Sequence, residues 1–354
     1  MRKIILIILV LNIFISCKTS SDIVKKFSDM GFQSVQIDTL FQDKVNIRAI
    51  LIDNNKIWYA ADNSRFGFYD LEKNKKSENH ILNDDLKFEF RSIAQTSLAI
   101  FVLNVSNPAL LYKISKDGSE TKLVYQENHE KVFYDSMQFW NNTEGIAIGD
   151  PISNCLTIIT TNDGGNSWNK IPCDKLPKTN DGEGAFAASN TNIVIKENKT
   201  WIVTGGKKAR VFYSPDKGKT WEVHDTPIVQ GKTMTGIFTA DFYDSKKGFI
   251  AGGNYELPNQ NFLNKALTTN GGKTWELQYE NQGFGYASCV QYVPDSNGME
   301  LVSVGASGLY YSSDSGHSWK KIAADSSLFT IRFLDKHNAI AAGQNKMVRL
   351  NFKK

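Results

Sequence analysis

One eight-residue pattern occurs four times between residues 161 and 319. Each copy follows a segment rich in β-forming residues and leads into another, as ARVFYS and WEVHD do around the second copy. This placement predicts the tight turn of a β-hairpin, in which glycine supplies a positive φ and an Asp or Asn side chain accepts hydrogen bonds from nearby amides. Four of the seven tryptophans end these copies, where a large ring can fill the space between adjacent sheets. The copies are TNDGGNSW (161–168), SPDKGKTW (214–221), TTNGGKTW (268–275) and SSDSGHSW (312–319).

The spacing of the copies predicts the architecture. Their third residues are 53, 54 and 44 residues apart along the chain. A period of about 40–50 residues with several short strands per unit is typical of the blades of a β-propeller. Weaker copies of the strand pattern occur at 47–62, at 90–104 and from 329 to the C-terminus. We therefore predict an all-β, seven-bladed β-propeller over residues 32–354. A strand at 32–41 closes the ring beside the C-terminal strands, and the repeated turns join the third and fourth strands of their blades.

The repeated pattern, Ser/Thr-x-Asp-x-Gly-x-Ser/Thr-Trp, resembles the Asp-box, or bacterial neuraminidase repeat, of sialidases, sortilin-type receptors and the photosystem II assembly-factor propellers. Three copies match fully, and the third copy has Asn270 in place of Asp. The resemblance covers most of the chain and implies a propeller in which these turns build the structure and do not catalyse. The residues assigned to the turns are Asp163, Trp168, Asp216, Trp221, Asn270, Trp275, Asp314 and Trp319.

The N-terminus has the character of an export signal. Residues 1–16 begin with Arg2 and Lys3, continue as an apolar run and end in a small residue before Cys17. The segment FISC resembles the lipobox of bacterial lipoproteins, which implies that Cys17 is lipidated and anchors the exported protein in the cell envelope. The alternative is a simple cleaved signal with a chance cysteine. Residues 17–31 are expected to form a polar tether. Without residues 1–16 the formal charge falls from +4 to +2, so no basic field indicates nucleic-acid binding.

Propeller topology predicts which residues surround the end of the central channel opposite the repeated turns. One group lies at the starts of the innermost strands, and a second group lies in the loops after the second strands. In the later blades the strand starts are Gly184, Gly236, Ala287 and Thr330. Four of the seven arginines fall there, which suits an acidic or glycan ligand because a guanidinium group binds carboxylates in a fixed geometry. The alternative is a solvated rim of charges that neutralise one another. The predicted ligand-binding residues are Arg48, Arg65, Arg91, Asp135, Asp150, Glu183, Arg210 and Tyr255, the last in the long loop 253–263.

Three cysteines follow Cys17, and two of them flank the first repeated turn. In a hairpin centred on Gly164, opposite residues have numbers that sum to 328, so Cys155 faces Cys173. An oxidising compartment favours a disulfide between them. A one-residue bulge would instead place the two side chains on opposite faces. Cys289 is expected to remain free and buried.

Signals for catalysis and cofactors are weak. A sialidase-like site implies an Arg-x-Pro sequence before the first turn, and no arginine here is followed two residues later by proline. Asp135 and Glu183 are the candidate catalytic carboxylates of a glycoside hydrolase. The segment GEGAFA (182–187) matches a dinucleotide pattern, but it lacks the preceding apolar strand and the following helix. The histidines show no metal-ligand spacing. We therefore predict no cofactor and no metal. The leading functional hypothesis is a lipid-anchored, protein-binding scaffold, and the alternative is the hydrolase.

Overall fold

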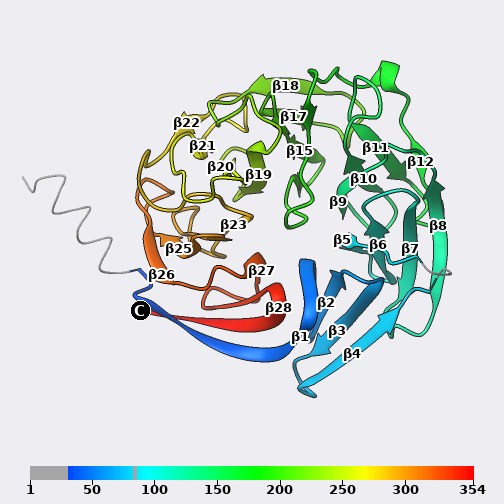
Figure 1. Ribbon diagram of the computed structural model, residues 1–354, viewed down its shortest axis with the longest axis horizontal. Coiled ribbons are helices and arrows are strands. Elements are labelled where there is room, and N and C mark those ends of the chain that lie inside the picture. The colour runs from blue at the N-terminus through cyan, green and yellow to red at the C-terminus, as the bar shows by residue number, and fades with distance from the viewer. Residues whose placement is uncertain (1–30, 83–85) are drawn as a thin grey trace, which may run out of the picture.

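The computed structural model describes residues 31–82 and 86–354. The predicted signal segment, Cys17 and the tether up to residue 30 lie outside this range. The described chain is almost entirely β-strand, with one short 3-10 helix, η1 (Cys173–Lys175). The sheets stand around a central axis, as Figure 1 shows, which confirms the prediction of an all-β propeller. No helix within the described ranges has the length and apolar character needed to cross a membrane.

The strands of the described residues form six hydrogen-bonded sheets. The first contains, in spatial order, β27 (Leu328–Phe333), β28 (Asn338–Lys353), β1 (Ser34–Asp53), β2 (Lys56–Ala61), β3 (Arg65–Asp70) and β4 (Lys75–His80). The second contains β5 (Phe90–Gln95), β6 (Ala99–Asn104), β7 (Ala109–Ser115) and β8 (Thr121–Glu127), and the third β9 (Tyr134–Phe139), β10 (Gly145–Gly149), β11 (Thr157–Thr161) and β12 (Asn169–Lys170). The fourth contains β14 (Ile193–Lys196), β15 (Lys199–Val203), β17 (Arg210–Ser214) and β18 (Glu222–Asp225). The fifth contains β13 (Glu183–Gly184), β16 (Gly205–Gly206), β19 (Thr235–Phe242), β20 (Gly248–Asn254), β21 (Lys265–Thr268) and β22 (Glu276–Leu277). The sixth contains β23 (Cys289–Tyr292), β24 (Leu301–Gly305), β25 (Gly308–Ser312) and β26 (Lys320–Ala323).

Counted by hydrogen-bonded sheets, the ring has six blades and not the predicted seven. The difference arises at β1, which is one continuous strand with two sets of partners. Residues 34–46 pair with β28, and residues 47–53 pair with β2. The expected closing strand and the first strand of the first blade are therefore the same strand, which joins the C-terminal strands to β2–β4. The pairing of β1 with β28 brings the two ends of the described chain together and closes the ring (Figure 1).

The four repeated turns share one hydrogen-bonding pattern. In the second copy, Ser214 and Thr220 donate hydroxyl hydrogen bonds to Asp216 at 2.9 and 2.7 Å, and the Thr220 amide donates to the same carboxylate at 2.8 Å. In the third copy Asn270 keeps the amide bond as an acceptor, but its Nδ2 donates to the Thr274 hydroxyl. In a degraded copy at 115–120, Asp117 also accepts hydroxyl bonds from Ser115 and Ser119 and an amide bond from Ser119, but Ser119 is two residues after Asp117 and not four. One short side chain thus satisfies amides that the tight turn leaves unpaired.

The turns also pack against the preceding sheet. Gly316 has φ +90°, and a Cβ there would lie 2.3 Å from the ring of Phe249. The adjacent Trp319 is 6% exposed and packs on Phe249 and Phe284, with ring centroids 5.7 and 4.8 Å away. Gly165 makes the equivalent close approach to Phe101. The hydrophobic core therefore lies between neighbouring sheets, and glycine is required where a turn rests on an aromatic ring.

Cys155 and Cys173 form a disulfide, and Cys289 is free and buried in β23. The strand register that suggested the disulfide is wrong by one residue. Thr160 pairs with Asn169, and Ile159 pairs with Lys170, so opposite residue numbers sum to 329. The cysteines still meet because the chain leaves β12 after Lys170 and turns into η1, which begins at Cys173. The disulfide therefore lies beyond the hairpin ladder.

Candidate functional site

Five of the innermost strands among the described residues, β1, β5, β9, β19 and β27, carry β-bulges at matching positions. In each bulge one residue has no partner in the ladder, which re-aims its side chain. The partners of Ile47 and Ala49 are adjacent in β2, so the residue between them, Arg48, is the extra one. The same irregularity identifies the extra residues of the other strands, which are Arg91 in β5, Asp135 in β9, Phe238 in β19 and Phe329 in β27. The first three are residues that the sequence predicted at the starts of the innermost strands. In β19 and β27 the sequence instead predicted Gly236 and Thr330, whereas the bulged residues are Phe238 and Phe329.

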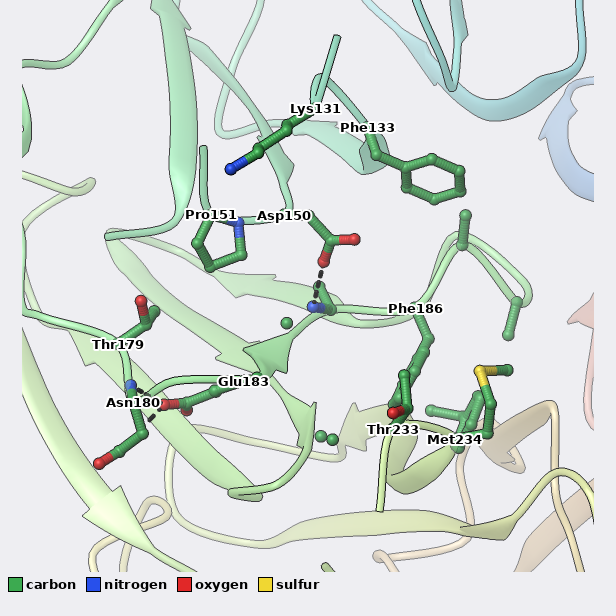
Figure 2. Close-up of a pocket in the computed structure, with 18 of the residues that line it drawn as sticks. Lys131, Phe133, Asp150, Pro151, Thr179, Asn180, Glu183, Phe186, Thr233 and Met234 are labelled. Carbon is green, nitrogen blue, oxygen red and sulfur yellow. Dashed lines mark hydrogen bonds between the residues drawn. The ribbon is translucent and has the colours of Figure 1, made fainter. Parts of the chain in front are cut away.

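A pocket with a volume of about 790 Å³ opens beside these bulges (Figure 2). Its size is in the range of small-molecule and cofactor sites. Five of the eight predicted ligand-binding residues line it, and none of the four repeated turns contributes a lining residue from the described chain. The predicted residues in the lining are Arg48, Arg91, Asp150, Glu183 and Tyr255.

The segment 185–192 forms the floor of the pocket. The sequence predicted that an innermost strand starts at Gly184. In the structure Gly184 belongs to β13, and the next strand, β14, begins at Ile193. Between them residues 187–192 are all buried. This segment makes hydrogen bonds to strands β1, β5, β9, β19 and β27, through Arg48, Ile93, Met137, Ala240 and Thr330. It therefore crosses the channel, and the pocket has a built floor.

Arg48 is a half-buried cation without a carboxylate partner among the described residues. Its guanidinium group lies over the ring of Phe329, 4.3 Å from the centroid, and donates a long hydrogen bond of 3.4 Å to the Ala188 carbonyl. Burial, and next the positive charge of Arg91, lower the pKa of Arg48. Arg91 itself forms an exposed ion pair with Glu89 at 2.6 Å. Two like charges held together in a partly buried place favour an anionic ligand.

Two carboxyl groups, Asp135 and Asp150, hold the floor segment from the other side. Asp150 lines the pocket and accepts a hydrogen bond from the Ala185 amide at 2.8 Å (Figure 2). Burial raises the pKa of Asp150 to about 6. Asp135 is fully buried, and its oxygens lack a hydrogen bond of normal geometry within the described chain. Burial, and next the charge of Asp150, raise the pKa of Asp135 well above its usual value. Asp135 is not part of the pocket lining, so it lies behind the pocket wall.

Glu183 and two predicted arginines are engaged in structural contacts. The Glu183 carboxylate is fully buried and accepts hydrogen bonds from Arg210 and Thr204. It also accepts a hydrogen bond from Asn180, which Figure 2 shows. Arg210 lies outside the pocket lining, as does Arg65, which pairs with Asp62 at 2.6 Å and donates to the Lys44 carbonyl. These two arginines connect loops to strands and do not reach the pocket.

Sequence reasoning missed an aromatic wall of the pocket. Phe186 and Phe238 stack with centroids 3.8 Å apart at 6°. The Tyr286 ring stands nearly perpendicular to both Phe238 and Tyr255, at 86° and 85°. All four residues line the pocket, and Tyr255 is 46% exposed. Gly205 makes the stack possible, because a Cβ there would lie 2.4 Å from the Phe186 ring. If the bulge in β19 had been recognised from the sequence, it would have identified Phe238 as a residue that faces the pocket.

Comparison with known proteins supports the fold. A structure of YCF48 bound to D1 peptide has a TM-score of 0.65 and 13% sequence identity, over 92% of this chain and 98% of that chain. YCF48 from Cyanidioschyzon merolae gives a TM-score of 0.63 at 11% identity, over 90% of this chain and 98% of that chain. The structure of U3-55K gives 0.61 at 11% identity, with the same coverage of both chains. No protein-family model and no curated protein matches the chain.

Proposed function

We propose that this protein is a non-catalytic β-propeller that binds a protein partner through the pocket at its channel mouth. The observation that carries the proposal is the pair Arg48 and Arg91, held beside each other in a pocket with a floor, with Arg48 lacking a carboxylate partner among the described residues. An acidic group of the partner would supply that missing charge. The structural likeness to a propeller solved with a peptide, YCF48 bound to D1 peptide, is in keeping with a peptide or protein ligand.

We further propose that the propeller works in the bacterial cell envelope. The apolar residues 1–16 would direct export, Cys17 would carry the lipid anchor, and residues 17–31 would separate the ring from the membrane surface. The disulfide between Cys155 and Cys173 supports an oxidising compartment. The repeated turns would act as structural Asp-boxes, because their carboxylate and amide side chains are occupied by bonds within the turn.

The hydrolase alternative receives no support from the two candidate carboxylates. A glycosidase needs two carboxyl groups that reach the same bond of the substrate. Glu183 is occupied by Arg210, and Asp135 is fully buried. A glycan is therefore proposed only as an alternative ligand and not as a substrate, and a glycan probe tests its binding.

The test is capture of partners from intact envelopes by chemical cross-linking to the full-length protein. The double variant Arg48→Gln with Arg91→Gln should lose the captured partner while keeping its melting temperature within a few degrees. Arg349→Gln is the matched control, because Arg349 lies in β28 and does not line the pocket. Equal capture by the double variant and the wild type would show that the partner binds elsewhere.

A further inference from the structure

We infer that the pocket recognises a peptide segment in which an aromatic and an acidic side chain are neighbours, with the aromatic ring at the Tyr255–Tyr286 corner and the carboxylate at Arg48. This inference rests on the proposed function and specifies its ligand. It requires that the pocket offer an aromatic subsite and a cationic subsite at a short distance from each other. Both requirements follow from the described residues.

The aromatic subsite is a corner and not a flat platform. The faces of Phe186 and Phe238 cover each other, so this stack offers little free ring face toward a ligand. Tyr286 and Tyr255 meet at 85° with centroids 5.2 Å apart. Tyr286 is 5% exposed and Tyr255 is 46% exposed, so Tyr255 supplies most of the open surface of the corner. A corner of perpendicular rings accepts a third ring by edge-to-face contact. A sugar ring would need an open, flat ring face, so the geometry favours an aromatic side chain.

The cationic subsite adjoins this corner. Arg48, Tyr255 and Tyr286 line the same pocket, and the side chain of Tyr255 contacts that of Arg48. Arg48 also stacks on Phe329, so its position is set by packing against a residue that does not line the pocket. A ligand carboxylate that binds Arg48 therefore places the adjacent residue of the same peptide at the tyrosine corner. Separate acidic and aromatic residues, far apart in a sequence, would not fit both places.

The remaining charges of the pocket fit one acidic group better than several. Asp150 and Asp181 also line the pocket, and Glu183 is already paired with Arg210. A highly acidic segment would place carboxylates against Asp150, where burial already disfavours the charged form. A single acidic side chain beside an aromatic one avoids that repulsion.

The experiment measures binding of four synthetic peptides to the full-length, detergent-solubilised protein by fluorescence polarisation. The probe is Gly-Ser-Phe-Asp-Ser-Gly, compared with versions in which Asn replaces Asp, Ala replaces Phe, or two serines separate Phe from Asp. Free N-acetylneuraminic acid, a carboxylated sugar, is the glycan probe. We expect the Phe-Asp peptide to bind about 10-fold more tightly than each of the other three, as expected for one desolvated aromatic or charged contact.

Variants assign each half of the peptide to its subsite. Tyr255→Ala should weaken the Phe-Asp peptide about 10-fold and leave the Ala-Asp peptide nearly unchanged, because coupling appears only between groups in contact. Arg48→Gln should weaken the Phe-Asp peptide about 10-fold and leave the Phe-Asn peptide nearly unchanged. Leu98→Ala, which removes a side chain that is 79% exposed and lies away from this pocket, and Arg349→Gln are the controls.

Equal affinities for the four peptides would overturn the inference, as would an equal effect of Tyr255→Ala on the Phe-Asp and Ala-Asp peptides. Binding of N-acetylneuraminic acid that exceeds every peptide and depends on Tyr255 would show a glycan subsite and would also overturn it. The proposed function is tested separately. If envelope capture depends on Arg48 and Arg91 but not on Tyr255, the protein-binding proposal stands and the aromatic–acidic specificity fails.

Discussion

Replacing Asp150 by Asn should make the protein more stable at pH 8 than the wild type, and this gain should vanish at pH 4. Asp150 has its pKa raised by burial from 3.8 to about 6. A carboxyl group of this kind contributes its full stability below pH 3.8, and the contribution is lost as the pH rises through 6. One pKa unit corresponds to about 1.4 kcal/mol, so the wild type loses about 3 kcal/mol between pH 4 and pH 8 that the variant does not lose.

The substitution leaves the local contact in place. The Asp150 Oδ1 atom accepts a hydrogen bond from the Ala185 amide at 2.8 Å, and an Asn side chain keeps an oxygen in that position. Burial, and next the charge of Asp150, raise the pKa of Asp135. The pH-dependent part of the difference between variant and wild type therefore includes both the loss of the Asp150 carboxyl group and the loss of its charge beside Asp135.

Urea denaturation followed by far-ultraviolet circular dichroism, repeated at each pH unit from 4 to 8, measures this difference. Asp181→Asn is the control, because Asp181 is 95% exposed at its side chain and should give a flat profile. A stability difference between Asp150→Asn and the wild type that stays constant from pH 4 to pH 8, or that falls as the pH rises, would refute the claim that burial disfavours the Asp150 carboxylate.

Further changes test the turns, the disulfide and the anchor. Trp319→Ala should lower the free energy of unfolding by about 3–5 kcal/mol, because it empties the space between Phe249 and Phe284, whereas Trp319→Phe should cost less; urea denaturation measures both. Asp216→Ala should cost about 1–2 kcal/mol by leaving turn amides unpaired, without loss of partner binding in the folded protein. Replacing Cys155 and Cys173 together by Ser should cost about 2–4 kcal/mol, and an unchanged urea midpoint would contradict a closed disulfide. Cys17→Ala should release the protein from membranes or leave it unprocessed, and a membrane-bound variant of mature mass would contradict the anchor.

The turns could be predicted because their information is local. All partners of the second turn lie within seven residues, so a short segment of sequence contains every one of them. These partners are Ser214, Asp216, Gly218 and Thr220. The period of the copies then fixes a ring of similar sheets. The sequence left open whether Cys155 and Cys173 form a disulfide, and the register that suggested it was wrong, since Cys173 lies in η1 and not opposite Cys155 in the ladder.

The bulges and the aromatic wall could not be predicted with the same reliability. A bulge adds one residue to a strand and shifts which side chain faces the channel, and only the pairing of the strands reveals where it lies. For this reason the comparison of the repeated strand patterns predicted Arg48, Arg91 and Asp135 but not Phe238. Arg65 and Arg210 were placed near the mouth by topology, yet their guanidinium groups turn to Asp62 and Glu183.

The sequence by itself determined the all-β fold and the repeated turns, because hydrogen-bonding patterns and strand periodicity are properties of short segments. It also indicated that the N-terminal strand lies beside the C-terminal strands, because a propeller closes its ring. The tertiary structure decided that β1 joins two sets of strands into one sheet, that residues 185–192 cross the channel, and that Tyr255 and Tyr286 adjoin Arg48. These features depend on contacts between residues that are distant in the chain, and their energies come from burial and charge in a shared environment. A pocket at the centre of a ring exists only once all the sheets are in place.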